Sequence, residues 1–204
     1  MMFDIDEGYK TGNFFNRITN FFRNRTILIY QELYLLERDA SKEGKREYDA
    51  VESIILTSKK DLEDLIDKGY TTGEFCRLTD LTEKFFRSQI LFGIFYKKKL
   101  IHISFLIIEN KIEFHPPMKL NFDKDVYVHW SITDPVCRGR GFYSYNLQKM
   151  TEFSSDIGKE KLKMAVGKDN ARSLKAAKHA GFEIYGEGRY IKFSKLVSWR
   201  EKYY

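Results

Sequence analysis

Apolar residues near the start of the chain recur with the period of an α-helix. Across residues 10–24 phenylalanines and one isoleucine lie three, four and seven positions apart, which predicts an amphipathic helix with an aromatic face. Residues 26–36 and 50–56 are instead apolar runs typical of β-strands. The chain therefore opens with a predicted helix followed by two strands.

Two more helices are predicted before the middle of the chain. Ser58 followed three residues later by Asp61 resembles a capping box, and Gly69 marks the expected end of that helix. Another helix is expected to begin near Asp80. Both would be short helices that cover a sheet.

Strands and helices alternate in the remaining sequence. Strand patterns occupy both sides of a lysine turn within residues 88–111, and they recur at residues 126–133, at residues 162–166 and in a terminal hairpin that pairs residues 182–185 with residues 189–193. Helical patterns cover residues 142–157 and 170–180, each followed by glycine. The order predicts an α/β fold with a mixed, mostly antiparallel central sheet flanked by helices.

Domain organisation is predicted from the same pattern. Residues 1–45 would form an N-terminal extension of a helix plus a strand, packed on a main domain of residues 46–204. The aromatic face of the first helix needs a partner surface, either on its own domain or across a homodimer.

Composition narrows the classes of protein that fit. Among 204 residues, 35 Lys and Arg outnumber 29 Asp and Glu, and the net charge of +6 favours an anionic partner. The lysines and arginines are spread along the chain, which argues against nucleic acid binding. Cys76 and Cys137 lie far apart, so we expect no metal site and a reducing, cytoplasmic location. No apolar run is long enough for a membrane span, and the acidic N-terminus is unlike a secretory signal.

The most informative segment joins a predicted strand to a predicted helix. It reads Arg138, Gly139, Arg140, Gly141 and Phe142. Glycines let the backbone approach a ligand closely, and amides at a helix start favour phosphate, to which the arginines add charge. A plain strand-to-helix turn is the alternative interpretation. The segment lacks the third glycine of a dinucleotide fingerprint and the Gly-Lys-Ser/Thr of a P-loop.

A second segment makes the first more specific. Asn170 opens the helix that ends in Gly181 and Phe182, and Pro135 precedes the glycine turn. Together the two segments resemble the GNAT acyltransferase superfamily over roughly residues 50–193. The resemblance implies a GNAT-like fold and acetyl-CoA as the acyl donor.

The same resemblance implies which residues hold the cofactor. Backbone amides of Arg138, Gly139, Arg140, Gly141 and Phe142 would bind the pyrophosphate of acetyl-CoA. The strand end at Ile132 and Thr133 would bind the pantetheine arm, and Asn170 would reach the same arm. For Asn170 an N-cap of its own helix is the alternative, and it could fill both roles.

Two positions depart from the family pattern. Val136 stands where the pattern has Gln or Arg, which puts one polar contact to the cofactor in doubt. Ala177 stands where many members place a tyrosine that protonates the departing CoA thiolate. A thiol with a pKa of about 8.5 can depart as the thiolate without such an acid, so Ala177 does not exclude acyl transfer.

A base is needed because an amine must lose a proton when it attacks a thioester. His129 has a suitable intrinsic pKa, and strand alternation places Asp125 and Tyr127 on the same face of the strand. These three are the candidate catalytic residues, although a structural role is the commoner fate of a lone strand histidine.

The leading hypothesis is an acetyl-CoA-dependent N-acetyltransferase. Its acceptor would be the amine of a small molecule, for instance an amino-sugar, bordered by residues 30–36 and 85–96. A longer acyl-CoA or an aminoacyl donor is a second possibility. A catalytically degenerate GNAT-like module that binds CoA or a partner protein is the alternative of a different class.

Overall fold

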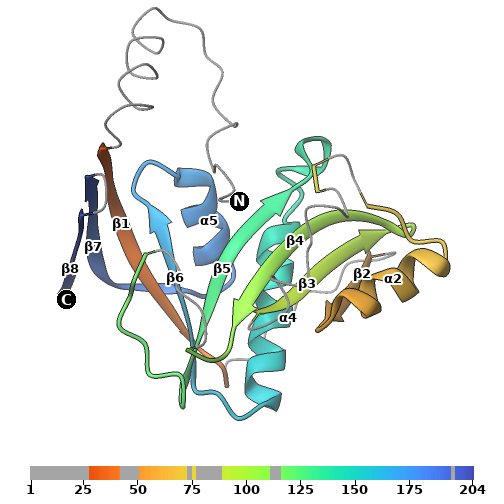
Figure 1. Ribbon diagram of the computed structural model, residues 1–204, viewed down its shortest axis with the longest axis horizontal. Helices are drawn as coiled ribbons and strands as arrows, with labels where there is room; N and C mark the ends of the chain where they lie inside the picture. The colour runs from red at the N-terminus through yellow and green to blue at the C-terminus, as the bar shows by residue number, and fades with distance from the viewer. Residues whose placement is uncertain (1–27, 42–50, 73–74, 77–88, 111–115, 194–195) are drawn as a thin grey trace, which may run out of the picture.

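The computed structural model describes residues 28–41, 51–72, 75–76, 89–110, 116–193 and 196–204. Within them one sheet has the strand order β2-β3-β4-β5-β6-β1-β7-β8 (Figure 1). The strands are β1 (Leu28–Asp39), β2 (Val51–Leu56), β3 (Gln89–Tyr96), β4 (Lys99–Ile107), β5 (Asp125–Thr133), β6 (Lys161–Gly167), β7 (Glu183–Phe193) and β8 (Leu196–Tyr203). The helices are α2 (Lys59–Asp67), α4 (Phe142–Asp156) and α5 (Ala171–His179), and a 3-10 turn, η2, spans Pro135–Cys137. The predicted α/β fold with a mostly antiparallel sheet is confirmed.

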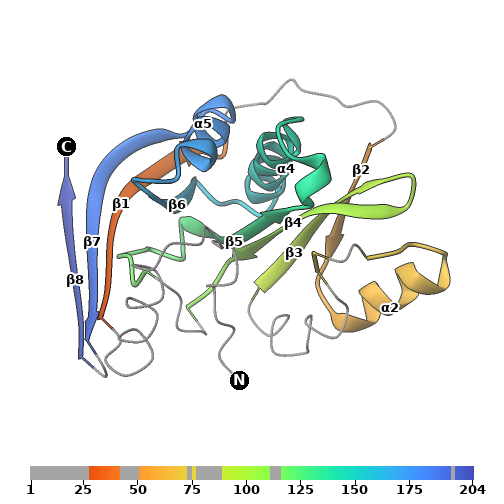
Figure 2. The same cartoon turned by 90° about the horizontal axis from the view of Figure 1, so that it is seen from above.

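The helices cover opposite faces of this sheet. Figure 2 shows α4 and α5 on one side and α2 on the other. Leu147 of α4 and Ala177 of α5 pack in one apolar cluster with Val126 of β5, whereas Leu62 of α2 packs with Phe105 of β4 in another. Ser58 and Asp61 form the predicted capping box at the start of α2.

The sheet contains one parallel pair among its described strands, and that pair separates. Strands β5 and β6 are in register only from Asp125 to Tyr127, opposite Lys161 to Lys163. Beyond this point β6 continues beside β1, and Figure 1 shows β5 and β6 diverging toward the edge where α4 begins. The sheet therefore opens between two neighbouring strands near the glycine turn.

A register shift in β5 changes which of its side chains face α4. Opposite Ser104 and Leu106 of β4 stand Ser131 and Val128, so β5 has an extra residue between them. The His129 ring lies beside the Tyr127 ring, with 6.1 Å between centroids and 37° between the ring planes. The bulge thus keeps His129 on the Tyr127 face and turns Ser131 toward α4, where it hydrogen-bonds to Tyr143.

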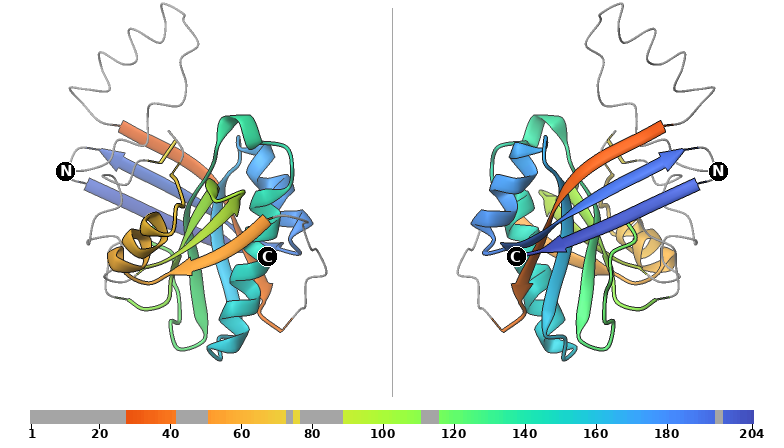
Figure 3. Two further views of the ribbon diagram at one scale, coloured as in Figure 1. Left: turned by 90° about the vertical axis from the view of Figure 1, so that its right-hand side faces the viewer. Right: turned by 90° about the vertical axis from the view of Figure 1, so that its left-hand side faces the viewer.

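Strand β1 lies inside the sheet, although it comes first among the described elements. It pairs with β6 on one side and β7 on the other, and Figure 3 shows this half of the sheet twisted strongly against β2 and β3. The helices predicted at residues 10–24 and near Asp80 lie outside the described residues. The N-terminal extension of residues 1–45 therefore stays a prediction.

The terminal hairpin was predicted wrongly. Residues 182–193 do not turn back on themselves, because β7 continues as one strand past Gly186 and Gly188 and pairs with β8. A Cβ added to Gly188 would lie 2.1 Å from the Trp199 ring, and one added to Gly186 would lie 2.6 Å from the Lys202 carbonyl oxygen. These glycines permit a close approach of β8 instead of marking a turn.

Candidate active site

The glycine turn has the backbone that the sequence predicts. Gly139 and Gly141 both have positive φ, at 77° and 85°, which residues with a Cβ rarely adopt. Gly141 is the N-cap of α4, and no side chain caps the amides that follow it. Helix-start amides that lack a side-chain cap are the groups that commonly bind a ligand or water.

The loop before the turn is held by side-chain contacts. Asp134 accepts a hydrogen bond from the Val136 amide at 3.1 Å, and its own amide donates to the Ile101 carbonyl at 2.9 Å. The Arg138 Nε donates to the Thr133 carbonyl at 3.2 Å. These contacts fix the end of β5 relative to the start of α4.

A cavity of about 850 Å³ lies at this point, between the end of β5, the start of α4 and the side of α5. It includes all eight residues predicted to bind the cofactor: Ile132, Thr133, Arg138, Gly139, Arg140, Gly141, Phe142 and Asn170. Ten further residues line it: His102, Ser131, Cys137, Tyr143, Ser144, Arg172, Ser173, Lys175, Ala176 and His179. The structure thus brings the two sequence segments to one site.

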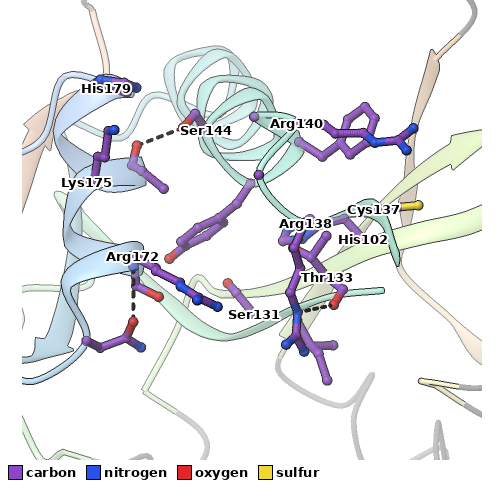
Figure 4. Close-up of a pocket in the computed structure, with 18 residues that line it drawn as sticks. His102, Ser131, Thr133, Cys137, Arg138, Arg140, Ser144, Arg172, Lys175 and His179 are labelled. Carbon is purple, nitrogen blue, oxygen red and sulfur yellow. Dashed lines mark hydrogen bonds between the residues drawn. The ribbon is translucent and has the colours of Figure 1, made fainter. Parts of the chain in front are cut away.

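Positive charge surrounds the cavity on two sides. In Figure 4 Arg172 and Lys175 of α5 lie across the cavity from the arginine-containing turn. None of the described residues that line it is Asp or Glu. Because like charges gather there without carboxylates, the cavity favours an anionic ligand.

Asn170 has the structural role that the sequence left open. Its Oδ1 accepts the Ser173 amide at 3.1 Å and caps α5. Asn170 also lines the cavity, and its side-chain amide nitrogen is a hydrogen-bond donor that a ligand could use. Ser144 of α4 donates to the Ala176 carbonyl of α5 at 2.9 Å and holds the two helices together beside the cavity.

Polar groups missed by the sequence analysis form the floor of the cavity. His102 is only 1% exposed, and its ring nitrogens contact Thr133 Oγ1 at 2.7 Å and Ser104 Oγ at 2.9 Å. Burial lowers the pKa of His102 to about 3, so the ring is neutral at physiological pH. Burial raises the pKa of Tyr143 to about 12, against a hydrogen bond with Ser131 that lowers it.

The three candidate catalytic residues do not line this cavity. The Asp125 carboxylate forms an ion pair with Lys163 at 2.9 Å and accepts the Asn121 amide at 3.0 Å. Burial raises the pKa of Tyr127 far above its ordinary value, so its phenol keeps its proton. His129 is half-buried and lies 3.2 Å from Gln89 Oε1 through its Nδ1.

Comparison with solved structures identifies the architecture. An acetyltransferase of the GNAT family from Colwellia psychrerythraea is 16% identical, with a TM-score of 0.54 over 81% of this chain and 56% of that chain. A GCN5-related N-acetyltransferase from Sphaerobacter thermophilus is 8% identical, with a TM-score of 0.52 over 92% of this chain and 56% of that one. The chain has the GNAT fold.

A functionally unknown conserved protein from Staphylococcus epidermidis is also similar in structure to this chain. It is 12% identical, with a TM-score of 0.56 over 90% of this chain and 68% of that chain. No family model matches the sequence, and no curated protein matches it. The chain spans just over half the length of the Colwellia and Sphaerobacter structures. The predicted GNAT resemblance is therefore confirmed as a relationship of fold.

The structure shows where the two positions that depart from the GNAT motif, Ala177 and Val136, lie. Ala177 is fully buried in the cluster that joins α4, α5 and the sheet, and it does not line the cavity. Val136 is 73% exposed on the loop before the glycine turn. Neither position directs a polar group at the cavity.

The described residues contain neither a metal-binding cluster nor a membrane-spanning helix. No three His, Cys, Asp or Glu side chains come together as a metal site in this part of the chain. None of its helices combines the length and apolar character needed to cross a bilayer.

Proposed function

We propose that this protein is an acetyl-CoA-dependent N-acetyltransferase. The cationic cavity at the opening between β5 and β6 carries the proposal. Uncapped amides of α4 and the Arg138 and Arg140 side chains suit a pyrophosphate, as helix starts with nearby arginines do. Arg172 and Lys175, on the opposite wall, suit a further phosphate such as the one on the ribose of CoA.

The acyl arm would extend from the turn along the end of β5. Ile132 and Thr133 line the cavity where β5 no longer pairs with β6, so main-chain groups of this strand end could bind the arm. The Thr133 carbonyl already accepts from Arg138 Nε and would have to exchange that contact. An acyl group at the gap between the strands would lie near both faces of the sheet. It could then meet an amine on the face that carries His129.

His129 is the proposed base among the three candidates. Asp125 is engaged with Lys163, and Tyr127 holds its proton, so neither suits that role. We expect Asp125 and Tyr127 to hold β5 and the His129 ring in place. The base assignment is tested by the pH–rate profile of His129→Gln, whose acid limb should disappear. An unchanged profile would remove His129 from the mechanism.

The acceptor is proposed to be a small-molecule amine, with an amino-sugar as one candidate. A panel of such amines, tested with acetyl-CoA and with longer acyl donors, would identify both substrates. A catalytically degenerate CoA-binding module is favoured by one observation, since buried Ala177 leaves no acid at that position. Binding of acetyl-CoA without turnover of any amine would support that second function.

Calorimetric titration with acetyl-CoA is the experiment that tests the cofactor site. Gly141→Ala should abolish or strongly weaken binding, because a Cβ disfavours the φ of 85° that aims the α4 amides. Gly158→Ala is the matched control, since Gly158 follows the other end of α4 with a φ of 73°. Both variants introduce similar strain, but only Gly141 lines the cavity. Equal effects, or no binding by the wild-type protein, would refute the site.

A further inference from the structure

A continuous chain of hydrogen bonds runs beneath the cavity, outside both sequence motifs. Thr133 Oγ1 lies 2.7 Å from His102 Nδ1, and His102 Nε2 lies 2.9 Å from Ser104 Oγ. Ser104 Oγ lies 2.7 Å from Ser131 Oγ, and Ser131 hydrogen-bonds to the Tyr143 hydroxyl. Four of these five residues line the cavity, and Ser104 lies behind them. Both ends of the chain thus reach the ligand space.

Counting the protons shows that the chain cannot satisfy itself. The four hydroxyls and the neutral imidazole carry five polar hydrogens in total, and four hydrogen bonds link them. One hydrogen is therefore left over. Ser131 can donate it to the His129 carbonyl, but at 3.4 Å that contact is long for a hydroxyl donor, whereas Ser131 lies 2.7 Å from Ser104. The arrangement with the shorter contacts keeps Ser131 within the chain and leaves the spare hydrogen at Thr133 or at Tyr143.

The tautomer of His102 decides which end donates. With the proton on Nε2, the ring donates to Ser104, the serines donate onward, and the Tyr143 hydroxyl hydrogen is left for the cavity. With the proton on Nδ1, every bond reverses and the spare hydrogen is at Thr133. The hydrogen bonds of this chain can therefore point in either of two directions. A ligand that accepts a hydrogen bond at one end would select the direction that donates to it.

We propose that His102 is a positioning residue that, with its proton on Nε2, directs the Tyr143 hydroxyl to donate to a carbonyl oxygen of a bound acyl-pantetheine arm. The inference rests on the proposed acetyl-CoA site. The arm offers amide and thioester carbonyl oxygens as strong acceptors. A phenol is a better donor than an alkyl hydroxyl, which favours Tyr143 over Thr133 as the donating end. The raised pKa of Tyr143 keeps that hydrogen in place through the neutral range.

Nitrogen NMR of the imidazole rings tests this assignment directly. The protein is labelled with ¹⁵N-histidine, and the His102 signals are identified by their absence in His102→Gln. Saturating acetyl-CoA should shift His102 to the tautomer protonated on Nε2. In Tyr143→Phe the addition of acetyl-CoA should no longer select that tautomer. A purely structural histidine would not respond to the ligand in this way.

Matched variants distinguish the effect of the hydrogen-bond chain from general effects of a substitution on the fold. Tyr145 is on the same helix and does not line the cavity, so Tyr145→Phe should keep the tautomer response. Ser131→Ala breaks the chain midway and should remove the response even if Tyr143→Phe folds poorly. Loss of one neutral hydrogen bond should also weaken acetyl-CoA binding roughly 3- to 10-fold in Tyr143→Phe.

Calorimetry on the same samples distinguishes the two levels of failure. If acetyl-CoA binds but His102 carries its proton on Nδ1, or responds equally in Tyr143→Phe, the inference is overturned and the proposed function stands. If the wild-type protein does not bind acetyl-CoA, the proposed function fails and the inference fails with it.

Discussion

Burial of His102 should make the stability of the fold depend on pH in a defined window. The pKa is 6.5 in an unfolded chain and about 3 in the folded protein. Above the unfolded value the ring is neutral in both states and costs nothing. As the pH falls below it, only the unfolded state gains the proton, so stability is lost progressively until the pH approaches the folded value.

The size of the effect follows from the gap between the two pKa values. Each unit is worth about 1.4 kcal/mol, so the ceiling is about 5 kcal/mol, and about 2 kcal/mol should be lost by about pH 5. Denaturant unfolding of the wild-type protein and His102→Gln at neutral pH and at about pH 5 would measure it. The variant lacks the titrating ring, so its stability should fall by about 2 kcal/mol less between the two conditions. Equal losses in both proteins would show that His102 is protonated in the folded state and refute the reasoning.

Three further changes test the packing and the charge around the site. Gly188→Ala should lower the free energy of unfolding by about 1–3 kcal/mol, because its Cβ would meet Trp199; an unchanged denaturation midpoint would contradict that packing. Ala177→Tyr should lower the melting temperature and leave acetyl-CoA turnover no faster, since the position is fully buried; faster turnover would mean that the ring reaches the cavity. Arg172→Gln should weaken CoA roughly 3- to 10-fold but 3′-dephospho-CoA much less, with exposed Lys178→Gln as the control; equal losses by calorimetry would exclude a contact to that phosphate.

Local signals in the sequence were sufficient for most elements and for the turn. The capping box of Ser58 and Asp61, and the glycines at 139 and 141, act within a few residues, so their outcome does not depend on the rest of the fold. The resemblance to GNAT proteins then placed Asn170 beside the turn. The structure brings these positions to one cavity.

Signals that depend on distant partners were missed. Gly186 and Gly188 suggest a turn until β8 is known to approach them, with Lys202 against Gly186 and Trp199 against Gly188. Nothing in the local sequence reveals those neighbours. His102 and Tyr143 belong to different elements, and their rings come within 5.4 Å only in the folded sheet. The bulge in β5 likewise separates His129 from Ser131, although strict alternation along the strand would place them on one face.

The interior position of β1 in the sheet also bears on how the protein folds. Leu33 of β1 pairs with Gly167 of β6 and with Gly188 of β7. β1 therefore cannot form these pairs until residues more than 130 positions later have been synthesised. Contacts of such long sequence separation slow folding, because the loop must close before any pairing is gained. During synthesis both edges of β1 would lack their partners, which is a state prone to aggregation. We expect slow folding and a dependence on chaperones, set by the topology of one strand.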